Sequence, residues 1–394
     1  MSIDIRSNNG MKKIKFLYIL NIAKRVNSFS YTSMLSAKEL GFEFHIAGNW
    51  SYTSNKERHA DEEKYGIKIH QIDFIRSPYH PGNRKAYAQL KSLVKIEKYD
   101  IIHCNTPIGG LLGRIVGLKY KVPKIIYQAH GFHFYKGAPL INWILFYPIE
   151  RLLAHFTDTL ITINHEDFEI AKKMHLRDCG KVYYVPGVGI DTETYFPNNV
   201  IRTAKRKELG LGDNDIMIIS SGDLVTRKNF GAIIEAVAEA NDKKLHLFIC
   251  GEGPKRDELV VTSQKLNIVD QVYLLGYRTD MCELLWAADI FVLATLQEGL
   301  SRSIMEAMAC GLPCIVSDIR GNSDLIVNEV NGLLFAPNDI AGFAKGILKI
   351  SNDKNMRIKM GISNLEIILD YNIESVSEKL KELYKLEISG VLQR

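Results

Sequence analysis

The feature that most constrains this chain is an alternation of short apolar runs with helix-length stretches, which occurs in both halves of its 394 residues. Such alternation is typical of a parallel sheet that is covered by helices on both faces. A chain of this length exceeds what one hydrophobic core holds, so two domains are expected. We therefore predict an α/β fold of two doubly wound, Rossmann-like domains.

In the first half, the alternation continues to a turn-rich run, Val185–Asp191, that contains Pro186 and two glycines. The predicted strands are Ile14–Leu20, Glu43–Ala47, Ile67–Phe74, Ile101–Cys104, Lys124–Ala129 and Thr159–Ile163. The predicted helices are Phe29–Leu40, Ala86–Glu97 and Leu140–Phe156. Because the turn-rich run breaks the pattern, we place a domain boundary there, with a first domain over residues 1–187.

The second half repeats the alternation and gives a second domain over residues 188–372. Its predicted strands are Ile216–Ser220, Leu245–Cys250, Gln271–Leu275, Ile290–Ala294 and Cys314–Ser317. Its predicted helices are Phe230–Ala240, Lys255–Leu266, Met281–Ala287 and Ser301–Ala309. A last helix, within residues 373–394, carries Val376, Leu380, Leu383 and Leu386 at helical spacing, which predicts one apolar face.

The amino-terminal stretch is better interpreted as a first strand than as an export signal. Its apolar part is short, Lys24-Arg25 follows, and no small-residue cleavage site appears. Met11 is a candidate functional start, which makes the first ten residues a dispensable tail. Six cysteines lack paired or zinc-type spacing, so reduced thiols in a cytoplasm are expected. No apolar run reaches the roughly 20 residues that span a bilayer.

Charge is divided unevenly between the two halves. Residues 1–190 hold 27 Lys and Arg and 16 Asp and Glu, which gives a net charge of +11. The remaining residues hold 23 Lys and Arg and 29 Asp and Glu, which gives a net charge of −6. A basic half indicates an anionic partner: nucleic acid, an anionic membrane or a phosphorylated substrate. A solvated basic surface is the alternative. No recognition motif accompanies the charge, so nucleic acid is not expected.

The run Leu296–Gly311 follows a predicted buried strand and holds two glutamates: Glu298 lies above the N-terminus of the predicted helix, and Glu306 lies about a turn inside it. Ligands of open α/β sheets bind at this position, where a strand ends against a helix N-terminus. Backbone amides of Gly299, Leu300 and Ser301 can hold a diphosphate there, and the carboxylates can accept hydrogen bonds from sugar hydroxyls. The simpler alternative is one helix-start acid plus one solvated acid.

Further loops at predicted strand ends carry groups suited to the same ligand. Arg227 and Lys228 suit a phosphate, and Gly251-Glu-Gly253-Pro allows close backbone approach. Tyr277-Arg278 follows another strand. In the first half, His130 stands where a strand meets its loop, either as a functional group or as a half-buried side chain.

Three other patterns give weaker evidence for a function. Gly109, Gly110 and Gly113 do not form a dinucleotide fingerprint, so close helix packing is the expected role. Asp213-Asn-Asp215 looks like a metal pair but precedes its strand, at the edge opposite the loops, and is interpreted as a turn. His130 and His133 lack further ligands at metal spacing. No metal site is therefore expected.

Together these residues resemble the family 4 retaining glycosyltransferases of the GT-B fold, over nearly the whole chain. The motifs that carry the resemblance are Glu298/Glu306, Arg227-Lys228-Asn229, Gly251-Glu-Gly-Pro254, Gly276-Tyr-Arg278 and His130-Gly-Phe132. The sub-patterns Ala129–Leu140, Tyr147–Glu150 and Val185–Asp191 are similar to the branch that builds bacterial capsular and exopolysaccharide repeat units.

The resemblance implies a role for each motif. Glu306 is expected to bind ribose, Glu298 the donor sugar, and Lys228 with Arg227 the diphosphate, while His130 of the acceptor-binding first domain reaches the sugar across a cleft. His130, Glu298 and Lys228 are the expected catalytic residues. The expected donor-binding residues are Arg227, Lys228, Gly251, Gly253, Tyr277, Arg278, Glu298, Gly299, Leu300, Ser301, Arg302 and Glu306.

The implied reaction moves a sugar from a nucleotide donor, expected to be UDP-linked, to a polyprenyl diphosphate-linked saccharide at the inner membrane face. It needs no cofactor or metal. A nucleotide-sugar 2-epimerase of the same architecture and a non-catalytic sugar-nucleotide binder are the alternatives. Many members have Gly-Arg where this chain has Gly222-Asp223, which removes a phosphate cation. Arg302 either replaces it or pairs with Glu298 or Glu306.

Overall fold

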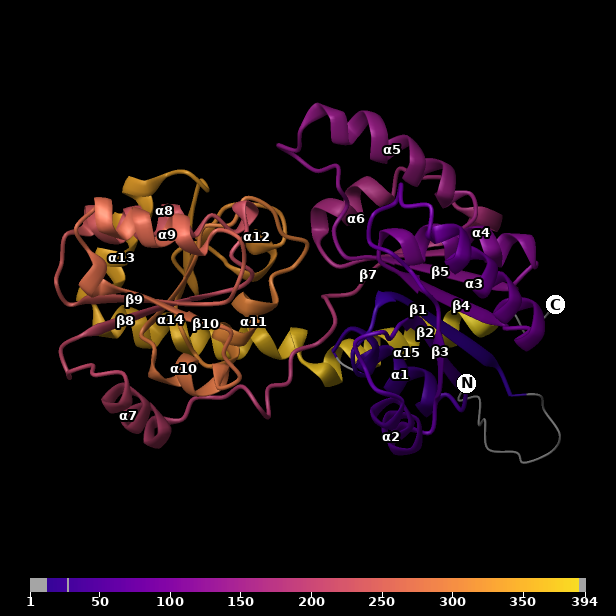
Figure 1. Cartoon of the computed structure of the whole chain (residues 1–394), viewed down its shortest axis with the longest axis horizontal. Coiled ribbons are helices and arrows are strands. Elements are labelled where there is room, and N and C mark those ends of the chain that lie inside the picture. Colours follow the sequence, from indigo (N-terminus) through magenta and orange to yellow (C-terminus); the bar gives the residue numbers. More distant parts are fainter. Residues whose placement is uncertain (1–12, 27, 390–394) are drawn as a thin grey trace. The chain divides into compact units, whose positions relative to one another are not determined.

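The computed structural model describes residues 13–26 and 28–389, which form two compact units (Figure 1). Unit 1 comprises the chain up to Thr162, Asp167–Val188 and the chain from Val376 onward. Unit 2 comprises Ile163–Glu166 and Gly189–Ser375. Met11 and the tail that precedes it lie outside the described residues.

Unit 1 is built on a seven-stranded parallel sheet with the order β3-β2-β1-β4-β5-β6-β7. The strands are β1 (Lys15–Ile22), β2 (Glu43–Asn49), β3 (Lys68–Gln71), β4 (Ile101–Asn105), β5 (Lys124–Ala129), β6 (Thr159–Thr162) and β7 (Lys181–Tyr184). The helices are α1 (Ser28–Glu39), α2 (Asn55–Tyr65), α3 (Asn83–Glu97), α4 (Pro107–Lys119), α5 (Leu140–Ala154) and α6 (His165–Ala171). The last helix of the chain is α15 (Ile373–Ser389).

Unit 2 is built on a six-stranded parallel sheet with the order β10-β9-β8-β11-β12-β13. The strands are β8 (Ile216–Ser221), β9 (Leu245–Cys250), β10 (Val272–Gly276), β11 (Ile290–Leu293), β12 (Cys314–Ser317) and β13 (Gly332–Phe335). The helices are α7 (Asn199–Glu208), α8 (Phe230–Ala240), α9 (Arg256–Lys265), α10 (Met281–Ala287), α11 (Arg302–Ala309), α12 (Asn322–Leu325), α13 (Ile340–Asn352) and α14 (Lys354–Ile367).

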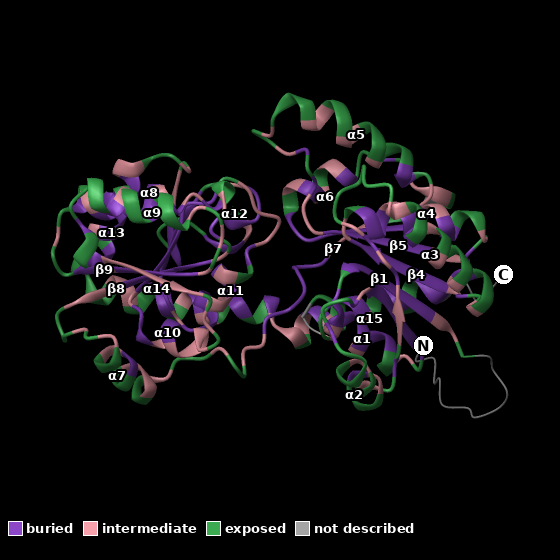
Figure 2. Cartoon of the chain, viewed as in Figure 1, coloured by how far each residue is buried: buried purple, intermediate pink, exposed green. Residues whose placement is uncertain are grey.

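Both sheets are buried on both faces, which explains why their strands are continuous apolar runs (Figure 2). In β1, Leu17 and Ile19 enter one core cluster while Phe16 and Tyr18 enter the cluster on the other face. In β8, Met217 and Ile218 are divided between two clusters in the same way. The prediction of doubly wound parallel sheets is confirmed.

The glycines of α4 allow this helix to approach the sheet closely. A Cβ atom on Gly113 would lie 2.8 Å from the Cβ of Cys104, and one on Gly110 would lie 2.5 Å from the ring of Tyr127. Neither neighbour can withdraw easily, because both lie in buried strands. The expected packing role of these glycines is confirmed.

Helix α15 completes the core of unit 1, with one correction to its predicted face. Val376, Leu380 and Leu383 are buried against the sheet, but Leu386 is 62 % exposed. Tyr384 is buried on the packed face instead, and its hydroxyl lies 2.8 Å from Nδ1 of the buried His103. The aromatic side chain fills the larger space between α15 and β4 that a leucine would leave empty.

Candidate active site

The loops that hold the predicted site residues share one edge of the unit 2 sheet. Because β10, β9, β8 and β11 are adjacent and parallel, the loops after their carboxyl ends lie side by side. Backbone hydrogen bonds connect three of them, from Gly222 N to Cys250 O and from Gly251 N to Gly276 O. The expectation that these loops gather at one edge is confirmed.

Glu298 lies in the β11–α11 loop and binds both predicted phosphate cations. Its Oε1 lies 2.6 Å from Lys228 Nζ and 3.3 Å from Arg227 Nη1. Lys228 is buried at the end of the 3₁₀ turn Thr226–Lys228, whereas Arg227 is 47 % exposed. Thr295 Oγ1 lies 3.1 Å from the same carboxylate oxygen. The Lys228–Glu298 pair is therefore largely removed from water.

Glu306 lies in α11 and is bound by one cation and one phenol. Its Oε1 accepts hydrogen bonds from Arg302 Nε at 2.8 Å and from Tyr195 Oη at 3.1 Å. Burial and the Glu306 carboxylate raise the pKa of Tyr195 well above its usual value, so the phenol stays protonated and remains a donor. This contact supports the simpler interpretation of Arg302, as a partner of Glu306.

The two glutamates share one property that matters for a ligand. In each, Oε1 takes the hydrogen bonds, and Oε2 accepts none from the described part of the chain. A carboxylate oxygen with both lone pairs available can accept hydrogen bonds from two vicinal hydroxyls of a sugar. The structure therefore leaves one acceptor oxygen on each side of the α11 N-terminus.

The start of α11 offers donors between these acceptors. Ser301 is its N-cap, but the Ser301 side chain makes no capping hydrogen bond to the helix backbone. Its hydroxyl lies 3.1 Å from the Ser303 hydroxyl instead. The positive end of the helix is thus directed at the loop formed by Gly299 and Leu300, which suits an anionic group.

The glycines in the loop after β9 allow this loop to pack closely against the loop after β8. Gly251 has a φ of +149°, and a Cβ atom there would lie 1.9 Å from Gly222 O. At Gly253 it would lie 2.5 Å from Leu224 O. The close backbone approach that the sequence predicts is thus an approach to the neighbouring loop, which brings the ends of β8 and β9 together.

Tyr277 and Arg278 follow β10 at the outer end of the same edge. The Arg278 guanidinium binds Asp280 through two hydrogen bonds of 2.7 and 2.6 Å, and Asp280 also accepts from Lys205. These cations hold the pKa of Asp280 well below its usual value. Tyr277 is 74 % exposed, so its ring is available to stack on a planar ligand.

His130 belongs to unit 1, where it follows β5. Its Nε2 lies 2.9 Å from Asn105 Oδ1, and its ring packs edge-on against Phe29. Because Asn105 offers an oxygen, Nε2 carries the hydrogen and Nδ1 is an acceptor. Desolvation lowers the pKa of His130 to about 4, so the imidazole is neutral near pH 7.

Comparison with known sequences places each unit in a glycosyltransferase family. Residues 7–164 match the model "Glycosyl transferase 4-like", and residues 201–365 match "Glycosyl transferases group 1". A relative from Bacillus subtilis, the putative glycosyltransferase EpsD, is 33 % identical over 375 residues, which cover 94 % of this chain and 96 % of EpsD. The chain is a family 4-type glycosyltransferase.

A second relative is named for a more specific activity. The UDP-Gal:alpha-D-GlcNAc-diphosphoundecaprenol alpha-1,3-galactosyltransferase of Escherichia coli is 34 % identical over 305 residues, 76 % of this chain and 79 % of that enzyme. Among solved structures, HepE from Anabaena in complex with UDP superposes with a TM-score of 0.76 at 18 % identity, covering 95 % of this chain and all of HepE. The glycosyltransferase thus has the GT-B fold.

Several residues that support the site were not predicted. Tyr195 lies 111 positions before Glu306, in the segment that follows the unit boundary. Asn164 donates to Gly299 O at 3.0 Å, and Arg320 Nε donates to Glu298 O at 3.1 Å. They fix the backbone of the glutamate loop from two distant segments. No local sequence signal marks them, because each acts through a contact between residues far apart in the chain.

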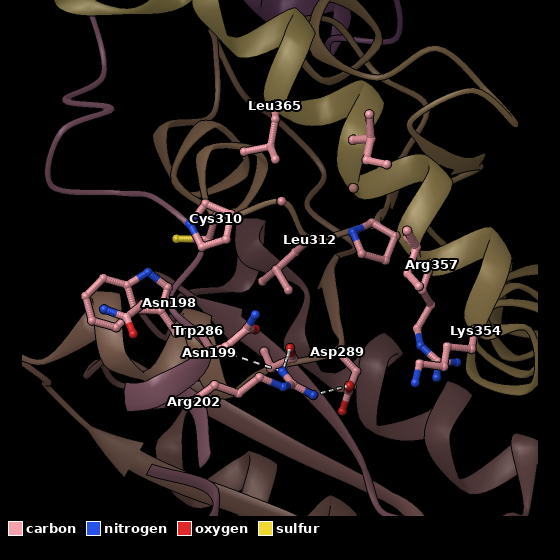
Figure 3. A pocket seen from close by; sticks show the side chains of 17 residues that line it. Asn198, Asn199, Arg202, Trp286, Asp289, Cys310, Leu312, Lys354, Arg357 and Leu365 are labelled. Atoms are coloured by element: carbon pink, nitrogen blue, oxygen red, sulfur yellow. Dashed lines mark hydrogen bonds and ion pairs between the residues drawn. The ribbon is translucent and has the colours of Figure 1, made fainter. Parts of the chain in front are cut away.

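A pocket of about 630 Å³ in unit 2 lies away from these residues (Figure 3). Its lining includes Asp289 and Leu312, which precede β11 and β12, so it opens at the amino ends of the strands. Arg202 in this pocket binds Asp289 at 2.6 Å. Because the predicted loops lie at the carboxyl ends, this pocket is not part of the candidate site.

Other sequence expectations can be assessed in the same structure. Asp213 and Asp215 lie in a turn before β8, as predicted, with Gly212 N bonded to Asp215 Oδ2. The cysteines whose side chains are described are free thiols, and burial raises the pKa of Cys250 to about 12. No helix over residues 13–26 and 28–389 has the length and apolar character needed to cross a membrane.

Proposed function

We propose that this glycosyltransferase moves a sugar from a UDP-linked donor to a polyprenyl diphosphate-linked saccharide in the synthesis of a bacterial surface polysaccharide. The observation that carries the proposal is the pair of glutamates at the α11 N-terminus, each with one carboxylate oxygen held and one available. The activity named for the Escherichia coli relative supports the substrate classes, a UDP-linked sugar as donor and a diphosphoundecaprenol-linked saccharide as acceptor.

Each residue of the edge has a role in this proposal. Glu306 Oε2 accepts from the ribose hydroxyls, and Glu298 Oε2 accepts from the donor sugar. The amides of Gly299, Leu300 and Ser301 bind the diphosphate. Lys228 has three ammonium hydrogens, of which one points to Glu298 Oε1, so it can bind a phosphate oxygen without losing its carboxylate partner.

The remaining donor contacts lie along the sheet edge. The loops that contain Gly251, Gly253, Tyr277 and Arg278 contact the base, largely through backbone groups. Arg227 adds a second cation beside Lys228. Asp223 is exposed and places no positive charge at the edge, so Lys228, Arg227 and the α11 amides must stabilise the leaving group between them.

The proposed chemistry retains the anomeric configuration and uses no metal or other cofactor. The bond between the sugar C1 and the diphosphate oxygen breaks, and an acceptor hydroxyl oxygen bonds to C1 from the same face. The hydroxyl proton passes to the departing diphosphate, which leaves as UDP. His130, neutral and with Nδ1 as an acceptor, aligns the sugar and acceptor hydroxyls rather than supplying a charge.

Unit 1 is proposed to bind the acceptor at the inner face of the cell membrane, with the enzyme a peripheral protein of the cytoplasm. The +11 balance over residues 1–190 supports this placement, because anionic lipids attract basic surfaces. Salt screens such attraction over about 10 Å, so docking by charge alone weakens as ionic strength rises.

A transfer assay tests the proposal. Purified full-length protein is incubated with a polyprenyl diphosphate-linked N-acetylhexosamine and, in turn, a panel of UDP- and GDP-sugars, with and without EDTA. We expect one UDP-sugar to give a lipid-linked disaccharide with a retained anomeric centre, equally in EDTA. Glu235→Ala, which removes an exposed glutamate of α8, serves as the control variant.

Three outcomes would contradict the proposal. Conversion of a UDP-sugar to its epimer without acceptor would identify an epimerase. Donor binding without any turnover would indicate a non-catalytic binder. Loss of transfer in EDTA that added Mg²⁺ or Mn²⁺ restores would overturn the metal-free mechanism.

A further inference from the structure

Helix α5 of unit 1 exposes apolar side chains over one complete side. Six large aliphatic residues on it are between 43 and 73 % exposed: Leu140, Ile141, Ile144, Leu145, Ile149 and Leu152. At about 100° per residue these positions, with Pro148 among them, occupy one continuous half of the helix circumference. We call these six residues the α5 outer face.

The opposite side of α5 is already packed. The Trp143 and Tyr147 rings lie 5.6 Å apart, and Tyr147 packs edge-on against the buried Phe134. Trp143 Nε1 donates to Tyr135 O, and Phe146 stacks on His133. Rotation of the helix therefore cannot bury the α5 outer face, because it would expose this aromatic cluster.

A helix that is apolar on all sides is normally buried in a core or in lipid. In α5 the inner side packs against the core of unit 1, whereas the outer side is exposed to water. A row of aliphatic side chains along a whole surface helix marks an interaction site rather than the scattered apolar residues of an ordinary surface. Figure 2 shows exposed residues along the length of α5.

The charged residues near α5 indicate which kind of partner the α5 outer face binds. Between residues 101 and 157 the chain has six Lys and Arg and a single acidic residue, Glu150. Glu150 is bound by the buried Arg114 at 2.8 Å, so its charge is neutralised on the inner side. Two exposed basic residues, Lys136 just before α5 and Arg151 on it, thus accompany the aliphatic groups of the α5 outer face, and the one acid of this helix is paired.

From this combination we infer that the α5 outer face inserts into the surface of an anionic lipid bilayer, with α5 lying in the plane of the interface. Aliphatic groups enter the boundary between headgroups and acyl chains, and basic residues beside them bind lipid phosphates. The inference rests on the proposed function for its purpose, because a polyprenyl-linked acceptor lies in a membrane. The binding itself requires neither donor nor acceptor.

Vesicle sedimentation tests the inference with the full-length protein and no substrate. The α5 variant is Ile144→Ser/Ile149→Ser/Leu152→Ser. The matched control, Val200→Ser/Ile358→Ser/Ile362→Ser, removes three comparably exposed aliphatic residues of α7 and α14 in unit 2. Vesicles contain either phosphatidylglycerol with phosphatidylethanolamine or phosphatidylcholine alone.

We expect wild type and the control variant to sediment with the phosphatidylglycerol vesicles, and the α5 variant to bind at least about tenfold more weakly. The conservative variant Ile144→Leu/Ile149→Leu/Leu152→Ile should bind like wild type, since it preserves apolar area. Circular dichroism and UDP affinity should be unchanged in all variants, because the substituted side chains are exposed.

Equal binding by wild type and the α5 variant, or no binding by either, would overturn the inference. So would a wild-type dimer in gel filtration that dissociates in the α5 variant, because the occupant would then be a second copy of this chain. Vesicle binding that depends on α5 together with absent sugar transfer would leave the inference standing and reject the proposed function instead.

Discussion

The two glutamates of unit 2 lie eight positions apart but are held in different ways. Glu298 is paired with Lys228, and both side chains are about 90 % buried. Glu306 is paired with Arg302, which lies one turn earlier on α11 and is 47 % exposed. The Lys228–Glu298 pair is therefore shielded from water on both sides, which strengthens it. The Glu306 carboxylate is nearly as buried, at 14 % exposed, but water reaches its cation Arg302 and screens that ion pair.

This difference indicates that the two glutamates have different roles. A buried ion pair that also faces a ligand presents a fixed charge pattern, as needed where a leaving group develops charge. A screened pair on a helix surface mainly orients one carboxylate for hydroxyl recognition. The contrast predicts that variants around Glu298 affect stability and turnover together, whereas variants around Glu306 affect nucleotide affinity.

The largest effect is expected from Lys228→Met. It leaves the buried Glu298 carboxylate with the exposed Arg227 and with Thr295, which should cost roughly 2–4 kcal/mol of unfolding free energy. The kcat/KM for the donor should fall at least about 100-fold. Urea unfolding and donor kinetics measure the two effects.

Lys228→Met/Glu298→Gln is the matched control for that experiment. It removes both charges, so most of the stability should return while activity stays low. If the double variant is no more stable than Lys228→Met alone, the description of this contact as a buried ion pair is wrong.

Glu306→Ala should act mainly on nucleotide binding. Loss of a charged acceptor for ribose hydroxyls is worth roughly 1.5–3 kcal/mol, which corresponds to a UDP affinity about 10- to 150-fold weaker. Isothermal titration calorimetry with UDP gives this directly, with Glu235→Ala as control. An unchanged dissociation constant would contradict the ribose role.

His130→Ala tests the part of the proposal that lies outside unit 2. Turnover should fall about tenfold or more while UDP affinity changes less than about threefold, because His130 acts on the sugar and acceptor. Its depressed pKa of about 4 means that protonation occurs only in acid. A pH profile of kcat should therefore show no His130-dependent inflection near 6.5, and the presence of one would contradict a neutral role.

Tyr195→Phe removes one of the two groups that orient Glu306. A single hydrogen bond to a carboxylate whose other partner remains should cost about 0.5–1.5 kcal/mol, or a two- to tenfold loss of UDP affinity. The same titration measures it. A larger loss than that of Glu306→Ala would mean that Tyr195 contacts the nucleotide itself.

The smallest effect is expected from Arg302→Ala. An exposed ion pair within one helix contributes about 0–1 kcal/mol, so UDP affinity and kcat/KM should change less than about fivefold. A loss of 1–3 kcal/mol in kcat/KM that Asp223→Arg partly restores would support the alternative that Arg302 replaces the phosphate cation missing at position 223.

Much of the fold could be predicted from the sequence because strands buried on both faces are continuous apolar runs. Two edge strands were missed, β7 and β13. The run Lys181–Tyr184 is half exposed, and Gly332–Phe335 is only four residues long and begins with glycine, which is unfavourable in strands. Helix α4 was missed for a related reason, because its glycines lower helix propensity although the structure needs them for packing.

Site prediction was limited by distance along the chain. The glutamates and the two cations are adjacent in short motifs, and the structure brings Glu298, Arg227 and Lys228 together. Tyr195 and Asn164 could not be predicted, because no local pattern indicates which segment packs beside the loop. The exposed side of α5 could not be predicted either, because the sequence of an apolar helix does not indicate which of its sides remains exposed.

The position of α15 in the chain decides when unit 1 can complete its core during translation. Its core includes Val376, Leu380 and Tyr384, which leave the ribosome after nearly all of the chain. Unit 2 can complete its sheet earlier, whereas unit 1, although it is translated before unit 2, must wait with part of one apolar face of its sheet uncovered. Unit 1 is thus completed only after the strands of unit 2 have been made, so a chain that is truncated near residue 370 should be prone to aggregation.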